Sequence, residues 1–268
     1  MATDLVVVYV PVGNGHKAAA LATAEVARRR GLTVEVLNLF DFAPKVVAEA
    51  YVASHVTGQT ILPRVYGYGY GIVNRRDGAF EPVRRGLDHV FFAGLVGAVE
   101  RLAPRAVLAT HHLPLVVLGR ERLEGRLAAP LLTVVTDYTA HACWAEEGVD
   151  VFCVACPRAR NELLLHGVPR DRIVLTGIPV RPAFESIAAV KNPSPGEATR
   201  VLVTSGGFGV GPVRSIARSF VGVPRVQVTV VCGTSTSLAE KLRSDDELTG
   251  VDLRVLGFER NMPARIAE

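Results

Sequence analysis

Short, almost continuously apolar runs alternate along the chain with longer stretches in which apolar residues recur at helical spacing. The runs are rich in valine, leucine and isoleucine, which favours strands that are buried on both faces. In the first part of the chain, the predicted strands are residues 5–10, 33–37, 106–110, 131–136, 151–155 and 173–176, and the predicted helices are residues 18–30, 83–102 and 158–166. Strands that alternate with helices predict a parallel, doubly wound sheet and therefore an α/β fold.

The alternation stops at residues 185–198, where the run Lys-Asn-Pro-Ser-Pro-Gly interrupts any period. Behind it we predict strands at residues 200–204, 226–231 and 253–256, helices from about residue 212 and over residues 237–243, and a last turn at residues 261–267. We therefore predict a first domain over residues 1–184, a linker over residues 185–198 and a second sheet domain over residues 199–268. Because a stable domain usually has about 100 residues or more, we expect the second domain to be incomplete.

Composition and charge narrow the class of protein. The chain has 49% apolar and 21% charged residues, which is typical of globular proteins, and a net charge of +4, which is too mild for a dedicated nucleic-acid binder. Four cysteines in 268 residues do not form a disulfide framework, and the N-terminus lacks the pattern of a signal peptide. No uncharged apolar stretch reaches the roughly 18 residues of a membrane-spanning helix. We expect a cytoplasmic protein without a nucleic-acid partner, whose contact with a membrane is peripheral.

A glycine-rich loop lies behind the first predicted strand of each domain. The loops contain Gly13 and Gly15 in the first domain, and Ser205, Gly206, Gly207 and Gly209 in the second. Glycine lets the backbone approach a ligand closely, and the free N–H groups at the start of the next helix attract an anion. One loop in each domain suits a ligand held between two sheets. The first loop by itself also fits a dinucleotide-binding fingerprint with Asp41 as the ribose-binding acid, and a tight turn explains either loop alone.

Two further motifs accompany the loops: TDYTAHACW at residues 136–144 and TGIPVRPAF at residues 176–184. Together with Gly-x-Gly-His-x-x-Ala-Ala at residues 13–20, they make nearly the whole chain resemble the family of monogalactosyldiacylglycerol synthases and processive diacylglycerol glucosyltransferases. The resemblance implies a GT-B fold of two Rossmann-like domains, the first binding a lipid acceptor and the second a UDP-sugar. It implies an enzyme that moves glucose or galactose from UDP-glucose or UDP-galactose to diacylglycerol with inversion, making a membrane glycolipid.

Inverting transfer requires a base that takes the proton of the acceptor hydroxyl, and His16 is the first candidate. A helix N-terminus disfavours imidazolium, so this side chain is expected to be neutral and able to accept a proton. A role for His16 as a hydrogen-bond donor only is the alternative. We predict Asp137, which directly follows a buried strand, as the second catalytic residue, and a role in capping the following turn is the alternative.

The acceptor pocket is expected near Asp137, because His141 and the chain's only tryptophan, Trp144, follow it closely. A purely structural role of Trp144 in the core is the alternative, and we consider His111 and His112 to be structural. The predicted acceptor-binding residues are Gly13, Gly15, His141, Trp144, Tyr66 and Tyr68.

On the donor side, backbone N–H groups of the second glycine loop are expected to stabilise the diphosphate of the leaving UDP. The chain has no convincing metal site, since Cys153 and Cys156 stand without a second pair at zinc spacing, and no cofactor is expected. The segment at Gly257 is similar to the start of the family's nucleotide site. The predicted donor-binding residues are Ser205, Gly206, Gly207, Gly209, Gly257, Phe258, Asn261 and Met262.

Much of the net positive charge lies between residues 64 and 85, where five arginines face two acidic residues beside a tyrosine- and glycine-rich stretch. Arginines and aromatic residues on a loop suit contact with an anionic membrane surface, here on the inner face of the cell membrane. The predicted membrane contacts are Arg64, Arg75, Arg76, Arg84 and Arg85. A flexible, solvated loop with scattered charges is the alternative.

Three other functions stay open at the level of sequence. An N-acetylglucosaminyltransferase that acts on a peptidoglycan lipid intermediate shares the two-lobed plan. A nicotinamide-dependent oxidoreductase fits the first glycine loop, and a non-catalytic lipid-binding homologue fits a reduced second domain. The sequence leaves glucose and galactose equally open as the transferred sugar.

Overall fold

The structure, a computed structural model, describes residues 3–12, 14–61, 81–185, 187, 194 and 196–268. Its internal contacts divide the chain into two compact units, Met1–Arg181 and Pro182–Glu268. Each unit is a parallel sheet with helices, as the alternating pattern predicts. The domain bounds predicted at residues 184 and 199 stay predictions, because most of the expected linker lies outside the described residues.

Unit 1 is built on a six-stranded sheet with the strand order β2-β1-β3-β4-β5-β6, in which every pairing is parallel. The strands are β1 (Leu5–Tyr9), β2 (Val34–Asn38), β3 (Ala106–Ala109), β4 (Leu131–Val135), β5 (Val151–Val154) and β6 (Ile173–Leu175). All six predicted strands are confirmed, each to within one residue at either end. The nearly unbroken runs of valine, leucine and alanine in β1, β3 and β4 reflect burial on both faces of the sheet, whereas Val174 and Leu175 of the edge strand β6 are 45% and 46% exposed.

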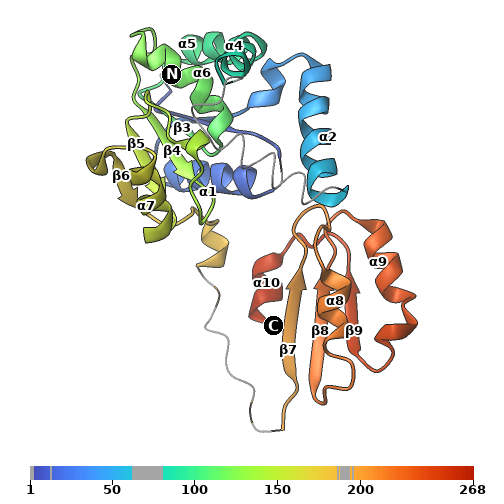
Figure 1. The fold of residues 1–268 in the computed structure, drawn as a ribbon. Helices are drawn as coiled ribbons and strands as arrows, with labels where there is room; N and C mark the ends of the chain where they lie inside the picture. Colours follow the sequence, from blue (N-terminus) through green and yellow to red (C-terminus); the bar gives the residue numbers. More distant parts are fainter. Residues whose placement is uncertain (1–2, 13, 62–80, 186, 188–193, 195) are drawn as a thin grey trace. The chain divides into compact units, whose positions relative to one another are not determined.

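Helices cover the two faces of this sheet (Figure 1). On one face α1 (Gly15–Arg29) packs Ala20 and Ala24 against Val7 of β1, and small alanines allow this close approach. On the other face α5 (Ala93–Leu102) and α6 (His112–Leu123) join a larger core that includes Trp144. The remaining helices of unit 1 are α2 (Lys45–Ile61), α4 (Glu81–Phe91) and α7 (Pro157–Leu165), with short 3-10 turns at η1 (Leu39–Phe42), η2 (Ala142–Trp144) and η3 (Arg170–Arg172).

The helices of unit 1 differ from the prediction in two places. The single helix predicted over residues 83–102 is broken at Phe92, which leaves the helical conformation and buries its ring beside Phe40. The helix α6 was not predicted at all. Its segment from Leu113 to Leu118 is buried on every side, so its sequence lacks the polar face that marks an amphipathic helix.

Unit 2 is a three-stranded parallel sheet with the order β7-β8-β9. The strands are β7 (Thr199–Thr204), β8 (Val226–Val231) and β9 (Asp252–Leu256), and the helices are α8 (Val213–Arg218), α9 (Thr236–Arg243) and α10 (Met262–Ala267), with 3-10 turns at η4 (Pro182–Phe184) and η5 (Asp246–Leu248). Val213 of α8 and Leu242 of α9 pack with Val228 and Val230 into one core. Side chains of α10 line one cavity together with residues of β7, β8 and β9, so this helix lies over a face of the sheet.

Candidate active site

The strand order of unit 1 reverses between β1 and β3. These two strands are neighbours in the sheet, but the helices that follow them, α1 and α6, belong to cores on opposite faces. In open α/β sheets, ligands bind where the strand order reverses in this way, because diverging connections leave a gap at the carboxyl edge. This switch point is therefore the expected ligand site of unit 1.

His16 lies in the first turn of α1, at this edge of the sheet. Its Nδ1 is 2.8 Å from the backbone oxygen of Thr110, behind β3, and 2.8 Å from Oγ1 of Thr136, behind β4. The Thr110 hydroxyl donates in turn to the backbone oxygen of His16 at 2.9 Å. The imidazole ring is thus held by two threonines that directly follow β3 and β4 and are far from it in sequence.

The environment of His16 favours the neutral ring. Burial lowers the pKa of His16 below its ordinary value, against the opposing effects of the hydrogen bond to Thr110 and the negative charge of Asp137. The positive end of the α1 dipole acts in the same direction as burial. A neutral imidazole can accept a proton, so the geometry is compatible with the predicted base.

The two histidines considered to be structural lie against His16 and Trp144. The ring centroid of His111 is 4.6 Å from that of His16, and the His112 ring stacks on His111 at 4.3 Å. The Trp144 ring is 6.0 Å from His112 and 6.3 Å from His111. His111 also has a structural function, since its Nδ1 accepts a hydrogen bond from the backbone N–H of Leu113 and so caps α6.

Asp137 and Trp144 contact each other, as their spacing suggests. The indole Nε1 of Trp144 donates to Oδ2 of Asp137 at 3.2 Å, while the ring itself is 1% exposed and part of the core. Burial lowers the pKa of the nearby His141, against the effect of the charges of Asp137 and Glu162. The carboxylate of Asp137 therefore acts on both His16 and His141 through its charge, while Thr110 and Thr136 hold the His16 ring.

Thr110 and Thr136 were missed in the sequence as site residues. Each is the last residue of a predicted strand and directly follows the observed strand, and this position at the carboxyl edge of a parallel sheet was the signal that could have found them. Of the other predicted acceptor residues, Gly15 starts α1, whereas Gly13, Tyr66 and Tyr68 lie outside the described residues.

In unit 2 the predicted donor loop follows β7 and is packed against the loop that follows β8. Gly206 and Gly209 adopt positive φ angles of 68° and 71°, which favour glycine. The backbone N–H and the hydroxyl of Thr234 both donate to the carbonyl oxygen of Gly207, at 2.9 and 2.8 Å. Ser205 donates from its backbone N–H and from its hydroxyl to the Val231 carbonyl.

Gly233 is essential to this contact, although the sequence did not single it out. Its φ is +60°, and a Cβ there would come within 2.5 Å of the carbonyl oxygen of Gly207. Ser235 then caps α9, since its hydroxyl accepts from the N–H of Leu238. The strand-glycine-helix pattern of the first two loops thus recurs after β8, and that repetition was the available signal.

The second predicted donor segment follows β9, at the same carboxyl edge of the three-stranded sheet. Asn261 caps α10 by accepting a hydrogen bond from the N–H of Ala264, and Met262 is the first residue of that helix. Gly257 directly follows β9, and Phe258 is 58% exposed. Both predicted donor segments of unit 2 therefore lie at one end of its sheet, as does the loop after β8.

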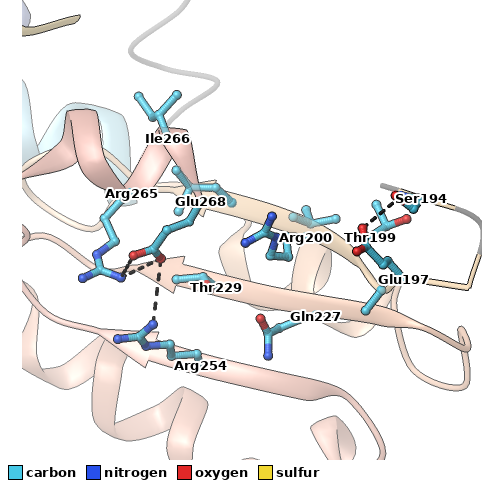
Figure 2. Close-up of a pocket in the computed structure, with 13 residues that line it drawn as sticks. Ser194, Glu197, Thr199, Arg200, Gln227, Thr229, Arg254, Arg265, Ile266 and Glu268 are labelled. Atoms are coloured by element: carbon cyan, nitrogen blue, oxygen red, sulfur yellow. Dashed lines mark hydrogen bonds and ion pairs between the residues drawn. The ribbon is translucent and has the colours of Figure 1, made fainter. Parts of the chain in front are cut away.

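A cavity of about 620 Å³ lies elsewhere in unit 2, beside the amino-terminal half of β7 (Figure 2). It is lined by residues 197–202 and by side chains of α10, β8 and β9, and includes none of the donor residues predicted from the sequence. Figure 2 shows the Glu268 carboxylate between the guanidinium groups of Arg265, at 2.6 Å, and Arg254, at 4.0 Å. These charges compensate one another, so we assign the cavity no part in the chemistry.

The arginine-rich segment is described only at its end. Arg85 forms two hydrogen bonds to Glu146, at 2.7 and 2.6 Å, and the Glu146 side chain is only 5% exposed. Arg85 therefore balances a buried carboxylate, a function that the sequence did not suggest, and its contact with a membrane stays a prediction. Arg64, Arg75 and Arg76 lie outside the described residues, and so does the side chain of Arg84.

The described residues offer neither a cluster of metal ligands nor a membrane-spanning helix. Among the described residues, no group of three or more histidine, cysteine, aspartate or glutamate side chains is arranged to hold a metal ion. Burial raises the pKa of the Cys153 thiol, which suits a thiol packed at a strand. No helix in the described part of the chain is both long and apolar enough to span a bilayer.

Comparison with known proteins relates the chain to a family. Residues 16–180 match the family model of monogalactosyldiacylglycerol (MGDG) synthase. The processive diacylglycerol β-glucosyltransferase of Bacillus subtilis is 30% identical over 262 residues, covering 92% of this chain and 65% of the relative. The enzyme of that name from Bacillus mycoides is 28% identical over 261 residues, covering 93% of this chain and 65% of the relative. The chain thus spans slightly less than two thirds of these relatives.

Solved structures with the same fold are more distant in sequence. MurG of Acinetobacter baumannii has a TM-score of 0.55 and 15% identity, over 99% of this chain and 71% of that one. Anabaena HepE in complex with UDP and glucose has a TM-score of 0.52 and 12% identity, over 99% of this chain and 72% of that one. These likenesses confirm the predicted α/β fold of GT-B type with parallel, Rossmann-like sheets.

Proposed function

The chain belongs to the monogalactosyldiacylglycerol synthase family, and from this premise we propose that it transfers glucose or galactose from a UDP-sugar to diacylglycerol. In the proposed reaction, the oxygen of the diacylglycerol hydroxyl attacks the anomeric carbon of the sugar. The bond from that carbon to the diphosphate oxygen breaks, UDP leaves, and the hydroxyl proton passes to His16. The product is a glycolipid with inverted configuration at the anomeric carbon.

The geometry of His16 is the observation that supports this proposal best. The ring is fixed at the switch point of unit 1 by Thr110 and Thr136, and burial keeps its pKa low. A base works well when it is neutral at the working pH and held within reach of the proton that it accepts. The charge of Asp137 nearby stabilises the imidazolium that forms during transfer.

The carboxyl edge of unit 2 is proposed to bind the UDP-sugar. The loop of Ser205, Gly206, Gly207 and Gly209 has glycines at positive φ, which let its backbone approach a ligand closely. The N–H groups of Ser205 and Gly206 donate to Val231 and Thr204, so the N–H groups proposed to stabilise the leaving diphosphate are those of the residues that follow them. Binding through backbone N–H groups needs no metal ion. The relative from Anabaena, whose structure was solved with UDP and glucose, has the same fold and supports a nucleotide-sugar donor.

We also propose that α4 brings unit 1 to an anionic membrane surface on the inner face of the cell membrane. Its inward side carries Arg85, paired with Glu146, and His89, whose Nε2 is 3.4 Å from Glu121. Its outward side exposes apolar residues one helical turn apart, Leu87 at 49% and Val90 at 70%. A helix with charges turned inward and apolar residues outward suits the interface of a bilayer.

A transfer assay tests the proposed function. We expect the purified chain, given UDP-glucose or UDP-galactose and vesicles that contain diacylglycerol, to release UDP and to form one glycolipid that carries the labelled sugar. His16→Ala should reduce this rate at least about a hundredfold, because the base is lost. His166→Ala, at the end of α7, is the matched control and should retain the rate. Labelled glycolipid from neither sugar, or an unchanged rate in His16→Ala, would refute the proposal.

A further inference from the structure

We propose that Thr136 is a positioning residue for His16: together with the Thr110 carbonyl, its hydroxyl holds the proton on Nδ1, so that Nε2 is the atom that accepts the proton of the acceptor. The inference deepens the proposed function and rests on it for its catalytic part. The assignment of the tautomer does not depend on any activity. It follows from which groups surround one nitrogen of the ring.

The argument begins with the Thr110 carbonyl oxygen, 2.8 Å from Nδ1 of His16. A carbonyl oxygen only accepts hydrogen bonds, so an unprotonated Nδ1 at this distance would oppose two lone pairs. Nδ1 must therefore carry the proton. In the neutral ring, which burial favours, the other nitrogen is then unprotonated and can act as a base.

Thr136 completes the arrangement on the same side of the ring. Its Oγ1 is 2.8 Å from Nδ1 and 3.5 Å from the Thr110 carbonyl oxygen. The consistent assignment is that Oγ1 accepts from Nδ1–H and directs its own hydrogen toward that carbonyl oxygen. The hydroxyl thus shares the proton of Nδ1 and restrains rotation of the ring about its Cβ–Cγ bond.

The neighbouring His111 has the opposite tautomer for a similar reason. Its Nδ1 accepts from the N–H of Leu113 at 3.1 Å, so that in the neutral ring the proton is on Nε2. Two histidines in ring contact, at 4.6 Å between centroids, are therefore held in different protonation patterns by different backbone groups. Of these two rings, only that of His16 has an unprotonated Nε2 that can accept a proton. His111 therefore serves as an internal reference for the experiment.

Nuclear magnetic resonance of the chain with ¹⁵N-labelled histidine tests the assignment directly. At a pH where the rings are neutral, long-range ¹H–¹⁵N correlation distinguishes the two tautomers, and His16→Gln and His111→Gln assign the signals among the seven histidines. We expect the proton of His16 on Nδ1 and that of His111 on Nε2. A His16 ring protonated mainly on Nε2 in the unmodified chain overturns the proposal, and no variant is needed for this result.

Variants of Thr136 test its role as a positioning residue. Thr136→Ser keeps the hydroxyl and should leave the spectrum unchanged. Thr136→Val should make the Nδ1 proton exchange with water about fivefold faster, which corresponds to the loss of one hydrogen bond, and should populate the other tautomer. Thr133→Val is the matched control, because Thr133 lies in β4, is fully buried, and donates its hydroxyl hydrogen to the Ala109 carbonyl rather than to His16.

The rate of sugar transfer supplies a second measurement, which would not change in this way if Thr136 had only a structural role. In Thr136→Val we expect kcat to fall about tenfold with KM unchanged, and Thr136→Ser to restore it. An exchange rate that stays the same in Thr136→Val, or that changes equally in Thr133→Val, refutes the positioning role. If the tautomers and exchange rates are as expected but the unmodified chain transfers no sugar, the positioning inference stands and the proposed function fails.

Discussion

The carboxyl edges of the two sheets, where the candidate sites of the two units lie, are formed by different chemical groups. In unit 1 the edge is made of side chains, since the ring of His16 is held by Thr110 and Thr136 and lies against His111. In unit 2 the edge is made of backbone, where the loop behind β7 is bound through carbonyl oxygens to Thr234 and packed against Gly233.

This difference separates the two tasks of a transferase. Proton transfer needs a side chain whose pKa and orientation are set by its surroundings, and such a group requires burial and directed hydrogen bonds. Binding of a diphosphate needs several N–H donors in a fixed array, which backbone supplies when side chains do not obstruct it. Unit 1 is therefore expected to be sensitive to changes of charge, and unit 2 to changes of size.

The largest effect is expected where size is changed in unit 2. Gly233→Ala places a Cβ against the carbonyl oxygens of Gly206 and Gly207, and should destabilise unit 2 by roughly 3 kcal/mol and weaken UDP binding at least about tenfold. The matched control is Gly222→Ala, whose φ of +74° is strained in the same way but whose Cβ would meet no atom within 4 Å. Hydrogen exchange of β7 to β9 and titration calorimetry with UDP measure the two effects. Equal losses of stability and of UDP affinity in both variants would show that backbone strain, and not the contact with Gly206 and Gly207, causes the loss.

The second effect concerns charge in unit 1. Arg85→Ala leaves the buried Glu146 carboxylate without its partner and should lower the free energy of unfolding by about 2 to 3 kcal/mol. The fluorescence of Trp144, the only tryptophan, reports unfolding of unit 1 in urea. Arg120→Ala is the control, because Arg120 pairs with the more exposed Glu124 and should contribute less than about 1 kcal/mol. A loss in Arg85→Ala no larger than the control would mean that Glu146 is compensated in another way.

A third experiment asks whether the apolar side of α4 contacts a membrane. Changing Leu87 and Val90 to Gln should weaken binding to vesicles of phosphatidylglycerol and phosphatidylcholine about tenfold, because less apolar surface is removed from water. Sedimentation of vesicles measures the bound fraction. Replacement of Leu123 and Leu165, which are 61% and 85% exposed on other helices, by Gln is the control. Equal weakening in both double variants would mean that the contact is not specific to α4.

The smallest effect is expected for the charge of Asp137. Asp137→Asn retains an acceptor for Trp144 but removes the charge that raises the pKa of His16 and His141, so both pKa values should fall further. The acid limb of kcat/KM should move to lower pH by the same amount, as measured by NMR titration alongside kinetics. Asp171→Asn, at the exposed turn η3, should change neither.

The same pKa values predict how stability depends on pH. Because the pKa of His16 in the folded protein is below the ordinary value of 6.5, the unfolded chain binds the proton more readily. The free energy of unfolding should therefore fall as the pH is lowered from above 6.5 through the pKa of the folded state. In His16→Gln this fall should be smaller, and an identical pH dependence in both proteins would contradict the lowered pKa.

The order of elements could be predicted from the sequence because it depends on local patterns. The strands β1 to β6 were expected to within one residue, since each is a short apolar run between polar turns. The positions of His16 and Asp137 behind strands were visible for the same reason. The helix α6 was not visible, because burial of every residue from Leu113 to Leu118 removes the polar face by which a helix is recognised, and the break at Phe92 depends on packing with Phe40.

The class of fold, the two glycine loops and the candidate base of the proposed reaction follow from the amino-acid pattern alone. The groups that surround them depend on how the chain folds, because Thr110 and Thr136 are 94 and 120 residues away from His16 along the chain. They meet it since β3 and β4 follow β1 in the sheet, and strand order is not contained in the periodicity of any one segment. The pairing of Arg85 with Glu146 and the contact of Gly233 with the donor loop were decided in the same way. Hydrogen bonds and steric contacts between distant segments depend on how the strands are ordered and registered, whereas the strands themselves depend on their own side chains.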